Sequence, residues 1–188
     1  PALLFHILPT MRTLAHAGES ELRTIVTPPL HAIRQLGKSR QWTAALRLLR
    51  RALHSHVRTC TGLYGVAISA CGKGSQWQQA LLLLGELWGT KLQLDTASYN
   101  AGVDACAKGS QWQRAQSLLR QFPGVALEPD AISYNIAMSA CEKGGQWEQA
   151  LSLLKDLSTV MLRPDVVSFS AGVSACEKGG QWQQALSL

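Results

Sequence analysis

Hydrophobic residues recur at helical spacing along most of the chain. Within residues 131–165, Tyr134, Met138 and Cys141 stand at positions i, i+4 and i+7, which places them on one face of a helix. A second apolar face follows at spacings of three and four, and its members are Trp147, Ala150, Leu151, Leu154 and Leu157. The pattern predicts two consecutive amphipathic helices in this segment.

Turn signals bound both predicted helices. The Lys-Gly-Gly sequence at 143–145 ends the first helix, because glycine supplies a left-handed cap and a turn. The Arg-Pro-Asp sequence at 163–165 ends the second helix, because proline cannot continue it, and Asp165 is placed to cap the helix that follows. Residues 131–165 are therefore predicted to form one helical hairpin.

The hairpin pattern returns at a fixed interval. The tryptophan of a Gln-Trp pair recurs with a spacing of 77 − 42 = 35 residues, at Trp42, Trp77, Trp112, Trp147 and Trp182. Two further columns keep the same step, namely Ala45, Ala80, Ala115, Ala150 and Ala185, and Tyr64, Tyr99, Tyr134 and Phe169. A fixed period in this range indicates stacked units that bury their faces against one another. We therefore predict an all-α fold, an α-solenoid of stacked antiparallel helical hairpins with a groove along one side.

The period divides the chain into units. Residues 1–25 form an irregular N-terminal segment, and residues 26–60 form a degenerate repeat with Pro28-Pro29 where its first helix should begin. Three complete repeats and one truncated repeat follow, at 61–95, 96–130, 131–165 and 166–188. We expect the chain to be a piece of a longer protein.

Charge adds little to this picture. The net charge is +6, and residues 1–60 carry nine basic and two acidic residues, whereas residues 61–188 carry nine basic and ten acidic residues. A basic surface favours polyanionic partners, but it equally keeps a protein soluble. Because no apolar run approaches the ~20 residues of a membrane span, no membrane partner is expected.

Four of the five cysteines follow the repeat, at Cys71, Cys106, Cys141 and Cys176. Equivalent positions in neighbouring hairpins lie about 10 Å apart, whereas a disulfide needs Cα atoms within about 7 Å. With no CxxC pair for a metal, we expect buried, reduced thiols, and neither a metal nor a cofactor. Such thiols fit a reducing compartment. Cys60 lies outside the period and has no assigned role.

The sequence around these columns resembles one family of helical hairpins. Residues 131–165 carry Ser-Tyr-Asn near the start, Cys-x-Lys-Gly at the turn, Gln-Trp-x-x-Ala-Leu in the second helix and Pro-Asp at the end. They resemble the pentatricopeptide repeat over their whole length. The resemblance covers 61–188 clearly and 26–60 weakly. It implies a right-handed superhelix that binds single-stranded RNA, one base per repeat, and is not itself an enzyme. It also implies a role in RNA processing, stability or translation in the mitochondrion or chloroplast.

The resemblance further implies which residues face the RNA. The base-reading positions are the residue after the Ser-Tyr pair and the last residue of the repeat, which gives Asn100 with Asp130, Asn135 with Asp165, and the incomplete Asp95 and Ser170. The base-wedging positions are Ala97, Ile132 and Val167. The phosphate-contacting positions are Lys73, Lys108, Lys143 and Lys178. In this family the Asn–Asp pair is associated with uracil, so two adjacent repeats imply successive uracils, with the RNA running 5′ to 3′ along the chain.

Two repeats depart from the family pattern. In 61–95 the first reading position is Gly65, which has no side chain to hydrogen-bond. In 26–60 the reading pair would be Leu30 and Cys60, which cannot read a base by hydrogen bonds. Only two repeats therefore carry a complete reading pair.

Each implied role has a structural alternative. The asparagines could cap the start of the first helix, the aspartates could cap the next helix, and the lysines could complement a helix dipole. The solenoid could also be a tetratricopeptide-like scaffold that binds protein partners, since fold does not fix function. A third possibility is an enzyme whose catalytic domain lies outside this sequence; the chain has no GxGxxG, P-loop, GxSxG or HExxH motif.

Overall fold

A computed structural model describes residues 29–54, 61–90, 94–122 and 127–187, so the segment 1–25 and Cys60 lie outside the described residues. The described part contains ten α-helices and no strand. They are α3 (Pro29–Lys38), α4 (Trp42–His54), α5 (Thr61–Lys73), α6 (Trp77–Gly89), α7 (Thr96–Lys108), α8 (Trp112–Gln121), α9 (Ala131–Lys143), α10 (Trp147–Thr159), α11 (Val166–Lys178) and α12 (Trp182–Leu186). From α5 onward, each odd-numbered helix begins at the first residue of a predicted unit or repeat.

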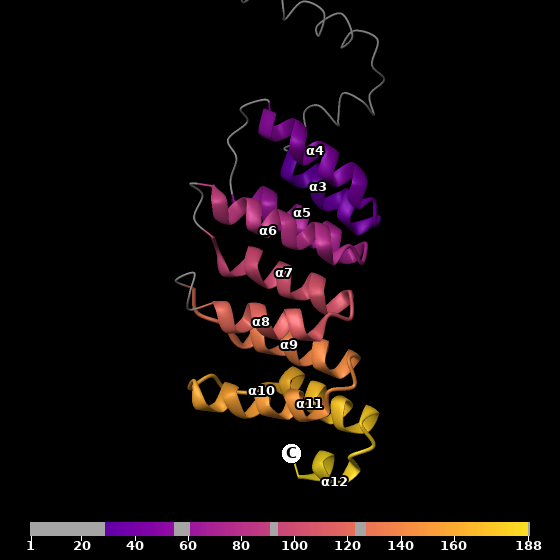
Figure 1. Cartoon of the computed structure of the whole chain (residues 1–188), viewed down its shortest axis with the longest axis vertical. Helices are drawn as coiled ribbons and strands as arrows, with labels where there is room; N and C mark the ends of the chain where they lie inside the picture. The colour runs from indigo at the N-terminus through magenta and orange to yellow at the C-terminus, as the bar shows by residue number, and fades with distance from the viewer. Residues whose placement is uncertain (1–28, 55–60, 91–93, 123–126, 188) are drawn as a thin grey trace, which may run out of the picture.

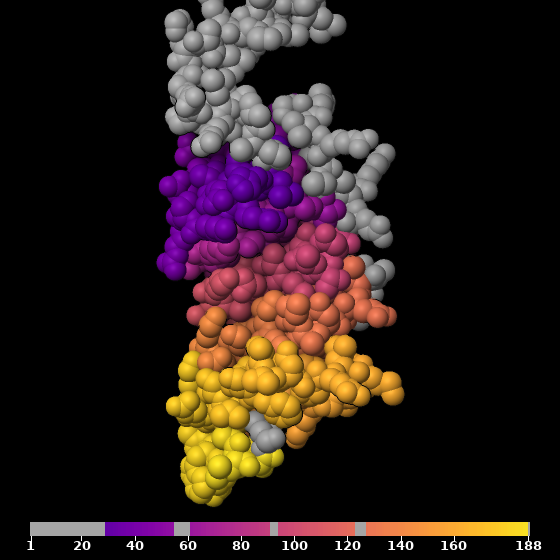
Figure 2. Space-filling model, turned by 180° about the vertical axis from the view of Figure 1, so that it is seen from behind, coloured from indigo at the N-terminus to yellow at the C-terminus, as the bar shows by residue number. Residues whose placement is uncertain are grey.

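The helices form antiparallel hairpins that stack in chain order (Figure 1). The first helices of the hairpins, α3, α5, α7, α9 and α11, each contact the next one in the series. The second helices α4, α6, α8 and α10 each contact the first helix of their own hairpin and that of the following hairpin. Figure 2 shows the hairpins as successive bands from indigo to yellow. The predicted α-solenoid is confirmed.

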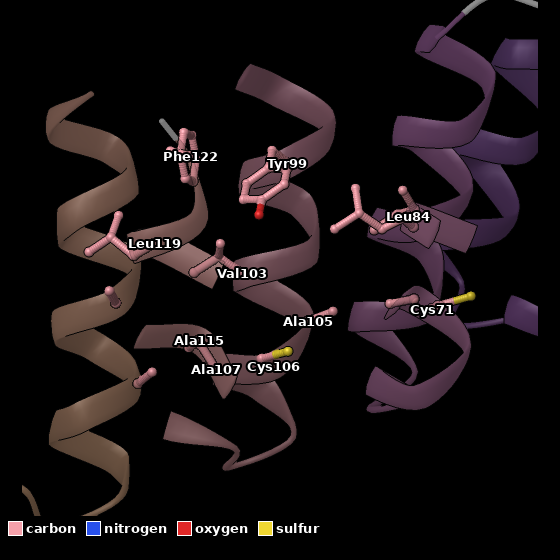
Figure 3. Packing of buried hydrophobic residues seen from close by; sticks show 14 of the residues in the cluster. Cys71, Leu84, Tyr99, Val103, Ala105, Cys106, Ala107, Ala115, Leu119 and Phe122 are labelled. Carbon is pink, nitrogen blue, oxygen red and sulfur yellow. The ribbon is translucent and has the colours of Figure 1, made fainter. Parts of the chain in front are cut away.

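Small side chains allow the first helices to stack closely. A Cβ added to Gly37 on α3 would lie 3.0 Å from the Cβ of Ala70 on α5. A Cβ added to Gly72 on α5 would lie 3.1 Å from the Cα of Ala105 on α7. The remaining space is filled by larger side chains, and Figure 3 shows Tyr99 and Val103 on the side of α7 where Leu119 and Phe122 lie. The first helices therefore form a continuous layer with little room between their backbones.

Three members of the aromatic column, Tyr64, Tyr99 and Tyr134, and the cysteine column are buried, whereas Phe169 is 41% exposed. The rings of Tyr99 and Phe122 meet edge to face with their centroids 4.4 Å apart. The four periodic cysteines are free and buried, as expected. Burial raises the pKa of the thiols of Cys71, Cys106 and Cys141 to about 11. These thiols are therefore neutral at physiological pH and act as small apolar groups.

The two glycines of the hairpin turn have different roles. Gly145 has a φ of +67°, which is the left-handed conformation predicted for the cap, whereas Gly144 has a φ of −84°. In three other hairpins this left-handed position holds Arg40, Ser75 or Ser110, with φ between 56° and 58°, and in the last hairpin it holds Gly180, with a φ of 67°. Backbone freedom is therefore not the reason for the glycine that follows each of the lysines Lys73, Lys108, Lys143 and Lys178, which we call the lysine column.

The first glycine of the turn makes room for a tryptophan of the preceding hairpin. A Cβ on Gly144 would lie 2.5 Å from Cδ1 and 3.0 Å from Cγ of Trp112, and a Cβ on Gly74 would lie 2.6 Å from Cδ1 of Trp42. Trp112 and Trp147 also pack against the hydrophobic core. The tryptophan column is thus a contact between successive hairpins, and the glycine column is its partner.

Candidate functional site

The residues predicted to face a ligand surround hollows on the side of the solenoid formed by the first helices, which we call the first-helix face. One hollow, the α9 hollow, has a volume of about 390 Å³, and its lining includes Ile132, Asn135, Lys143, Asp165 and Val167. These are the reading pair, both flanking wedge positions and the lysine of the repeat 131–165. The structure therefore brings together five residues that lie up to one full repeat apart in sequence.

A second hollow, the α5 hollow, has a volume of about 700 Å³. It is lined in part by Gly62, Gly65, Asp95, Ala97, Ser98 and Asn100. The predicted residues Asp95, Ala97 and Asn100 therefore lie together, while glycines occupy the wedge and reading positions of the repeat 61–95. Asp130, the predicted partner of Asn100, does not line this hollow but is hydrogen-bonded to Asn100.

The two complete reading pairs are hydrogen-bonded in the same way. Asn100 Nδ2 donates to Asp130 Oδ1 over 3.2 Å, and the Ser133 hydroxyl donates to Asn100 Oδ1 over 2.7 Å. In the next repeat Asn135 Nδ2 donates to Asp165 Oδ1 over 3.2 Å. The Ser168 hydroxyl likewise donates to Asn135 Oδ1 over 2.7 Å. Each network joins the end of one repeat to the first helix of the next.

These bonds fix the orientation of the asparagine amide. A carboxylate only accepts hydrogen bonds, so the amide nitrogen has to face the aspartate and the amide oxygen has to face the serine hydroxyl. The second N–H of the amide and the second lone pair of its oxygen remain for a ligand. Asn100 is 8% exposed, whereas Asn135 is half-buried. Each asparagine thus offers one donor and one acceptor in a fixed direction.

The aspartates cap helices, and the asparagines do not. Asp95 accepts a hydrogen bond from the Ser98 amide, and Asp130 and Asp165 each form a reciprocal capping box with Ser133 and Ser168. Asn100 and Asn135 lie in the second turn of their helices and bond to the next repeat instead. The capping alternative therefore holds for the aspartates and is wrong for the asparagines.

The same hydrogen bonds act on the aspartate carboxyls. Burial on its own raises the pKa of Asp130, but the hydrogen bonds from the Ser133 hydroxyl, the Ser133 amide and Asn100 lower it below its ordinary value of 3.8. The pKa of Asp165 is also lowered, first by the Ser168 amide and then by the Ser168 hydroxyl. Both aspartates are therefore ionised at neutral pH.

Acid is expected to weaken the junction between the repeats 96–130 and 131–165. Because the pKa of Asp130 is lower in the folded chain than its ordinary value of 3.8, its ionised form stabilises the fold above that pH. This stabilisation is lost as the pH falls from 3.8 through the lower folded pKa. Urea unfolding followed by circular dichroism at pH 7, 4 and 3 measures the loss.

Asp130→Asn is the matched control for this acid effect, because asparagine caps helices about as well as aspartate but does not titrate. The variant should show a smaller loss of stability between pH 4 and pH 3. An unchanged pH dependence in Asp130→Asn would show that the Asp130 network contributes nothing to acid sensitivity.

The predicted wedge residues are exposed. Ile132 is 60% exposed and Val167 is 59% exposed, and both line the α9 hollow. Ile132 belongs to the same repeat as Asn135, and Val167 belongs to the next repeat. Ala97 is also exposed. Exposure of large aliphatic side chains to water is unfavourable in free energy. A planar apolar group inserted between Ile132 and Val167 would therefore be stabilised, because it would cover both side chains.

The ion pairing of the lysine that ends each first helix differs from repeat to repeat. All four lysines end a first helix and are exposed, which also suits the helix dipole. Lys108 pairs with Asp104, four residues earlier on α7. Lys178 Nζ lies 2.8 Å from Glu142 Oε1. Within the described residues, neither Lys73 nor Lys143 forms an ion pair.

Two incomplete reading positions differ from the complete ones. Gly65 leaves space beside Ser98, and a Cβ at Gly65 would lie 2.8 Å from Ser98 Oγ. Ser170 is exposed on α11 and lines a separate hollow with Asp165. Leu30 lies on α3, and its predicted partner Cys60 lies outside the described residues.

Sequence reasoning missed the serine of each network. Ser133 is fully buried and Ser168 is buried, and each hydroxyl lies within 2.9 Å of both its asparagine and its aspartate. The recurring Ser-Tyr-Asn sequence carried the signal, since Ser98, Ser133 and Ser168 form a column at the repeat period. That column marks the third member of the reading network.

Neither a metal site nor a membrane-spanning helix is found in the part of the chain that the structure describes. It contains no group of three or more His, Cys, Asp or Glu side chains placed to hold a metal ion. None of its helices has the length and apolar character needed to span a bilayer.

Comparisons with known proteins bear on this site. Residues 132–159 match the family model of the PPR repeat, the pentatricopeptide repeat. No curated protein matches the sequence. The residues that match the family model span α9 from Ile132 onward and all of α10, and therefore the hairpin that carries Asn135.

Several solved structures share the fold. The PPR domain of Arabidopsis thaliana protein-only RNase P 1 in complex with tRNA has a TM-score of 0.65 and 15% identity, over 84% of this chain and 86% of that domain. PPR10 in complex with an 18-nt psaJ RNA element has a TM-score of 0.72 and 18% identity, over 89% of this chain and 25% of that protein. PPR10 from maize has a TM-score of 0.56 and 22% identity, over 96% of this chain and 30% of that protein. The chain thus spans about a quarter to a third of PPR10.

Proposed function

This chain contains a pentatricopeptide repeat and has the fold of pentatricopeptide-repeat proteins, and from that premise we propose that it binds single-stranded RNA along its first-helix face. Two of the similar structures are complexes with RNA. The proposed role of this part of the chain is binding.

One observation carries the proposal, namely the composition of the α9 hollow. Its lining contains the Asn135–Asp165 pair together with Ile132, Val167 and Lys143. An oriented amide, two exposed aliphatic side chains and an ammonium group match the three parts of a nucleotide, which are a base edge, two base faces and a phosphate. We propose one base per repeat, because the Asn–Asp pair recurs one repeat earlier with the same hydrogen bond.

The amide chemistry is compatible with uracil, the base that the family associates with an Asn–Asp pair. The free N–H of the Asn135 amide can donate to a uracil carbonyl, and its oxygen can accept from uracil N3–H. Asp165 holds the amide in that orientation through the 3.2 Å bond to its nitrogen. Asn100 and Asp130 repeat the geometry one unit earlier, so we propose a preference for two successive uracils.

The cellular role proposed for the chain follows the family. We propose that it acts in RNA processing, stability or translation in a mitochondrion or chloroplast. Localisation of a fluorescent fusion of the full-length protein and sequencing of the RNA crosslinked to it would test both parts.

Asn135→Ala is expected to abolish the preference for uracil at one position. Fluorescence anisotropy with oligonucleotides of U, A, C and G measures this preference for the wild type and the variant. We expect the variant to bind oligo-U about tenfold more weakly and the other oligonucleotides nearly unchanged, because a base-specific contact contributes about 1–3 kcal/mol of discrimination. The fold should persist, since the Ser168 hydroxyl still reaches Asp165 Oδ1 over 2.9 Å.

Ser152→Ala is the control for Asn135→Ala, because Ser152 is exposed on α10, outside the first-helix face. An equal loss for all four oligonucleotides in Asn135→Ala would argue against base reading by this residue. If the folded wild-type chain binds none of them, the protein-interaction scaffold becomes the better explanation.

A further inference from the structure

The first described hairpin carries positive charge and no negative charge. It consists of α3 and α4 and lies at one end of the stack of described hairpins (Figure 1). Residues 29–54 contain no aspartate or glutamate, and their lysine and arginine residues are Arg34, Lys38, Arg40, Arg47, Arg50 and Arg51. Neither of the two ion pairs among the described residues involves any of them. No ion pair of the described part of the chain therefore offsets this charge.

Three of these arginines lie side by side on α4. Arg47, Arg50 and Arg51 stand at positions i, i+3 and i+4, and all three are exposed. His54 continues the row, and its Nδ1 lies 2.7 Å from the carbonyl oxygen of Arg50. We call these four residues the α4 stripe. The buried side of α4 is the opposite one, which consists of Ala45, Leu49 and Ala52. Because α4 is a second helix, the α4 stripe lies outside the first-helix face.

The equivalent positions of the later second helices do not repeat this stripe. They hold Leu82, Gly85, Glu86 and Gly89 on α6, Ser117, Arg120 and Gln121 on α8, and Ser152, Lys155, Asp156 and Thr159 on α10. Like charges three or four residues apart repel each other and destabilise a helix. The α4 stripe is therefore a local feature with a cost in stability, and a bound anionic partner would remove that cost.

The α4 stripe fits a nucleic acid better than a protein or a membrane. Among the described residues of α3 and α4, no large hydrophobic side chain is exposed, whereas protein partners dock on apolar and aromatic anchors. The apolar side of α4 is buried in the solenoid, so this helix has no apolar face to insert into a lipid surface. Arginine presents forked N–H donors that suit phosphate oxygens, and interfaces with nucleic acids are strongly positive.

The same surface fits a double helix better than a single strand. Unpaired bases are stabilised by stacking on aromatic side chains. Trp42 is the only Phe, Tyr or Trp in residues 29–54, and it contacts the next hairpin, since a Cβ on Gly74 would lie 2.6 Å from its Cδ1. The bases of a double-stranded RNA are already stacked, and proteins contact such RNA mainly through its phosphates and its shape. The α4 stripe offers those contacts without a stacking platform.

We propose that the α4 stripe binds the phosphate backbone of a base-paired segment of the same RNA whose single-stranded segment lies on the first-helix face. The proposal rests on the proposed function and names the class of RNA, which is a single-stranded stretch next to a double helix. Arg47, Arg50 and Arg51 bind phosphate oxygens of the double helix, whatever its sequence.

Two RNAs test the proposal, namely oligo-U and the same oligo-U with a base-paired hairpin stem at each end. The wild type should bind the stem-bearing RNA more tightly, with a steeper dependence of log K on log salt concentration. The triple variant Arg47→Gln, Arg50→Gln, Arg51→Gln should reduce that slope by up to about 2.7, because each phosphate contact on a double helix contributes about 0.9. Its binding to oligo-U should remain nearly unchanged. Glutamine forms helices about as well as arginine, so the fold should persist.

Lys155→Gln is the matched control, because Lys155 is exposed at the position of α10 that corresponds to Arg50. It should leave the slope unchanged for both RNAs. A reduction as large as that of Arg50→Gln would show general charge attraction and overturn the proposal. An equal loss for the two RNAs in the triple variant would overturn it as well, and so would wild-type binding to the stem-bearing RNA that is no tighter than to oligo-U.

A base-paired RNA without a single-stranded segment separates this proposal from the proposed function. Binding of this duplex that is lost in the triple variant supports the α4 stripe as a double-helix site even if oligo-U does not bind. Binding of oligo-U without binding of the duplex would overturn the α4 proposal alone, and absence of both would overturn both proposals. Polyglutamate that displaces the duplex at equal charge concentration would indicate an acidic protein partner instead.

Discussion

Replacement of Gly144 by alanine is expected to lower the free energy of unfolding by about 2 kcal/mol. The backbone of Gly144, with φ −84° and ψ 0°, accepts alanine without strain. The new methyl group, however, would lie 2.5 Å from Cδ1 of Trp112, and Trp112 is packed against the core. The ring or the hairpin has to shift, which disturbs the contact between two successive repeats. Chemical unfolding followed by circular dichroism measures the change.

Gly85→Ala is the matched control for Gly144→Ala. Gly85 lies within α6, and a Cβ there would have no neighbour within 4 Å. The same glycine-to-alanine change should therefore stabilise the chain by up to about 1 kcal/mol, because alanine is the better helix former. Equal effects of the two substitutions would show that the tryptophan moves aside freely and that the Gly–Trp contact does not hold the repeats together.

Gly65→Asn is expected to add a third base-reading unit, with about a tenfold gain in affinity for uracil at the corresponding position. The aspartate of that unit, Asp95, is already in place and accepts a 2.7 Å bond from the Ser98 amide. A Cβ at position 65 would lie 2.8 Å from Ser98 Oγ, so the Ser98 hydroxyl has to rotate. The next junction shows the resulting position, because the Ser133 hydroxyl lies 2.7 Å from Asn100 Oδ1 and 2.8 Å from Asp130 Oδ1.

The new network should also stabilise the fold by about 1 kcal/mol, the net contribution of a typical intramolecular hydrogen bond. Anisotropy with oligonucleotides that vary only at the base opposite the repeat 61–95 measures the binding gain, and urea unfolding measures the stability. Gly65→Ala is the control, because it adds the Cβ without the amide and should create no base preference. A similar response to the two variants would argue against the Asn–Asp–Ser network as the reading unit.

Much of the fold could be predicted from the column spacing. Helical periodicity in 131–165 and the 35-residue step specified paired helices, and the Gly and Pro-Asp signals located their ends. Local sequence suffices there because helix formation and capping depend on side chains within one or two turns. The same reasoning assigned the wrong role to Gly144, which it took for part of a left-handed helix cap. Its actual partner, Trp112, lies in the preceding hairpin, and no local sequence pattern indicates a contact with another hairpin.

The sequence likewise predicted only part of the candidate site. The repeat period by itself determined that Asn100, Asn135, Asp130 and Asp165 recur at equivalent positions, and the family resemblance suggested their pairing. Only the tertiary structure showed that a buried serine bonds to each pair, that Glu142 forms an ion pair with Lys178, and that Arg40 lies beside several lysines. The physical reason is that periodicity reports what each repeat has in common, whereas hydrogen bonds and uncompensated charge depend on how one repeat meets the next.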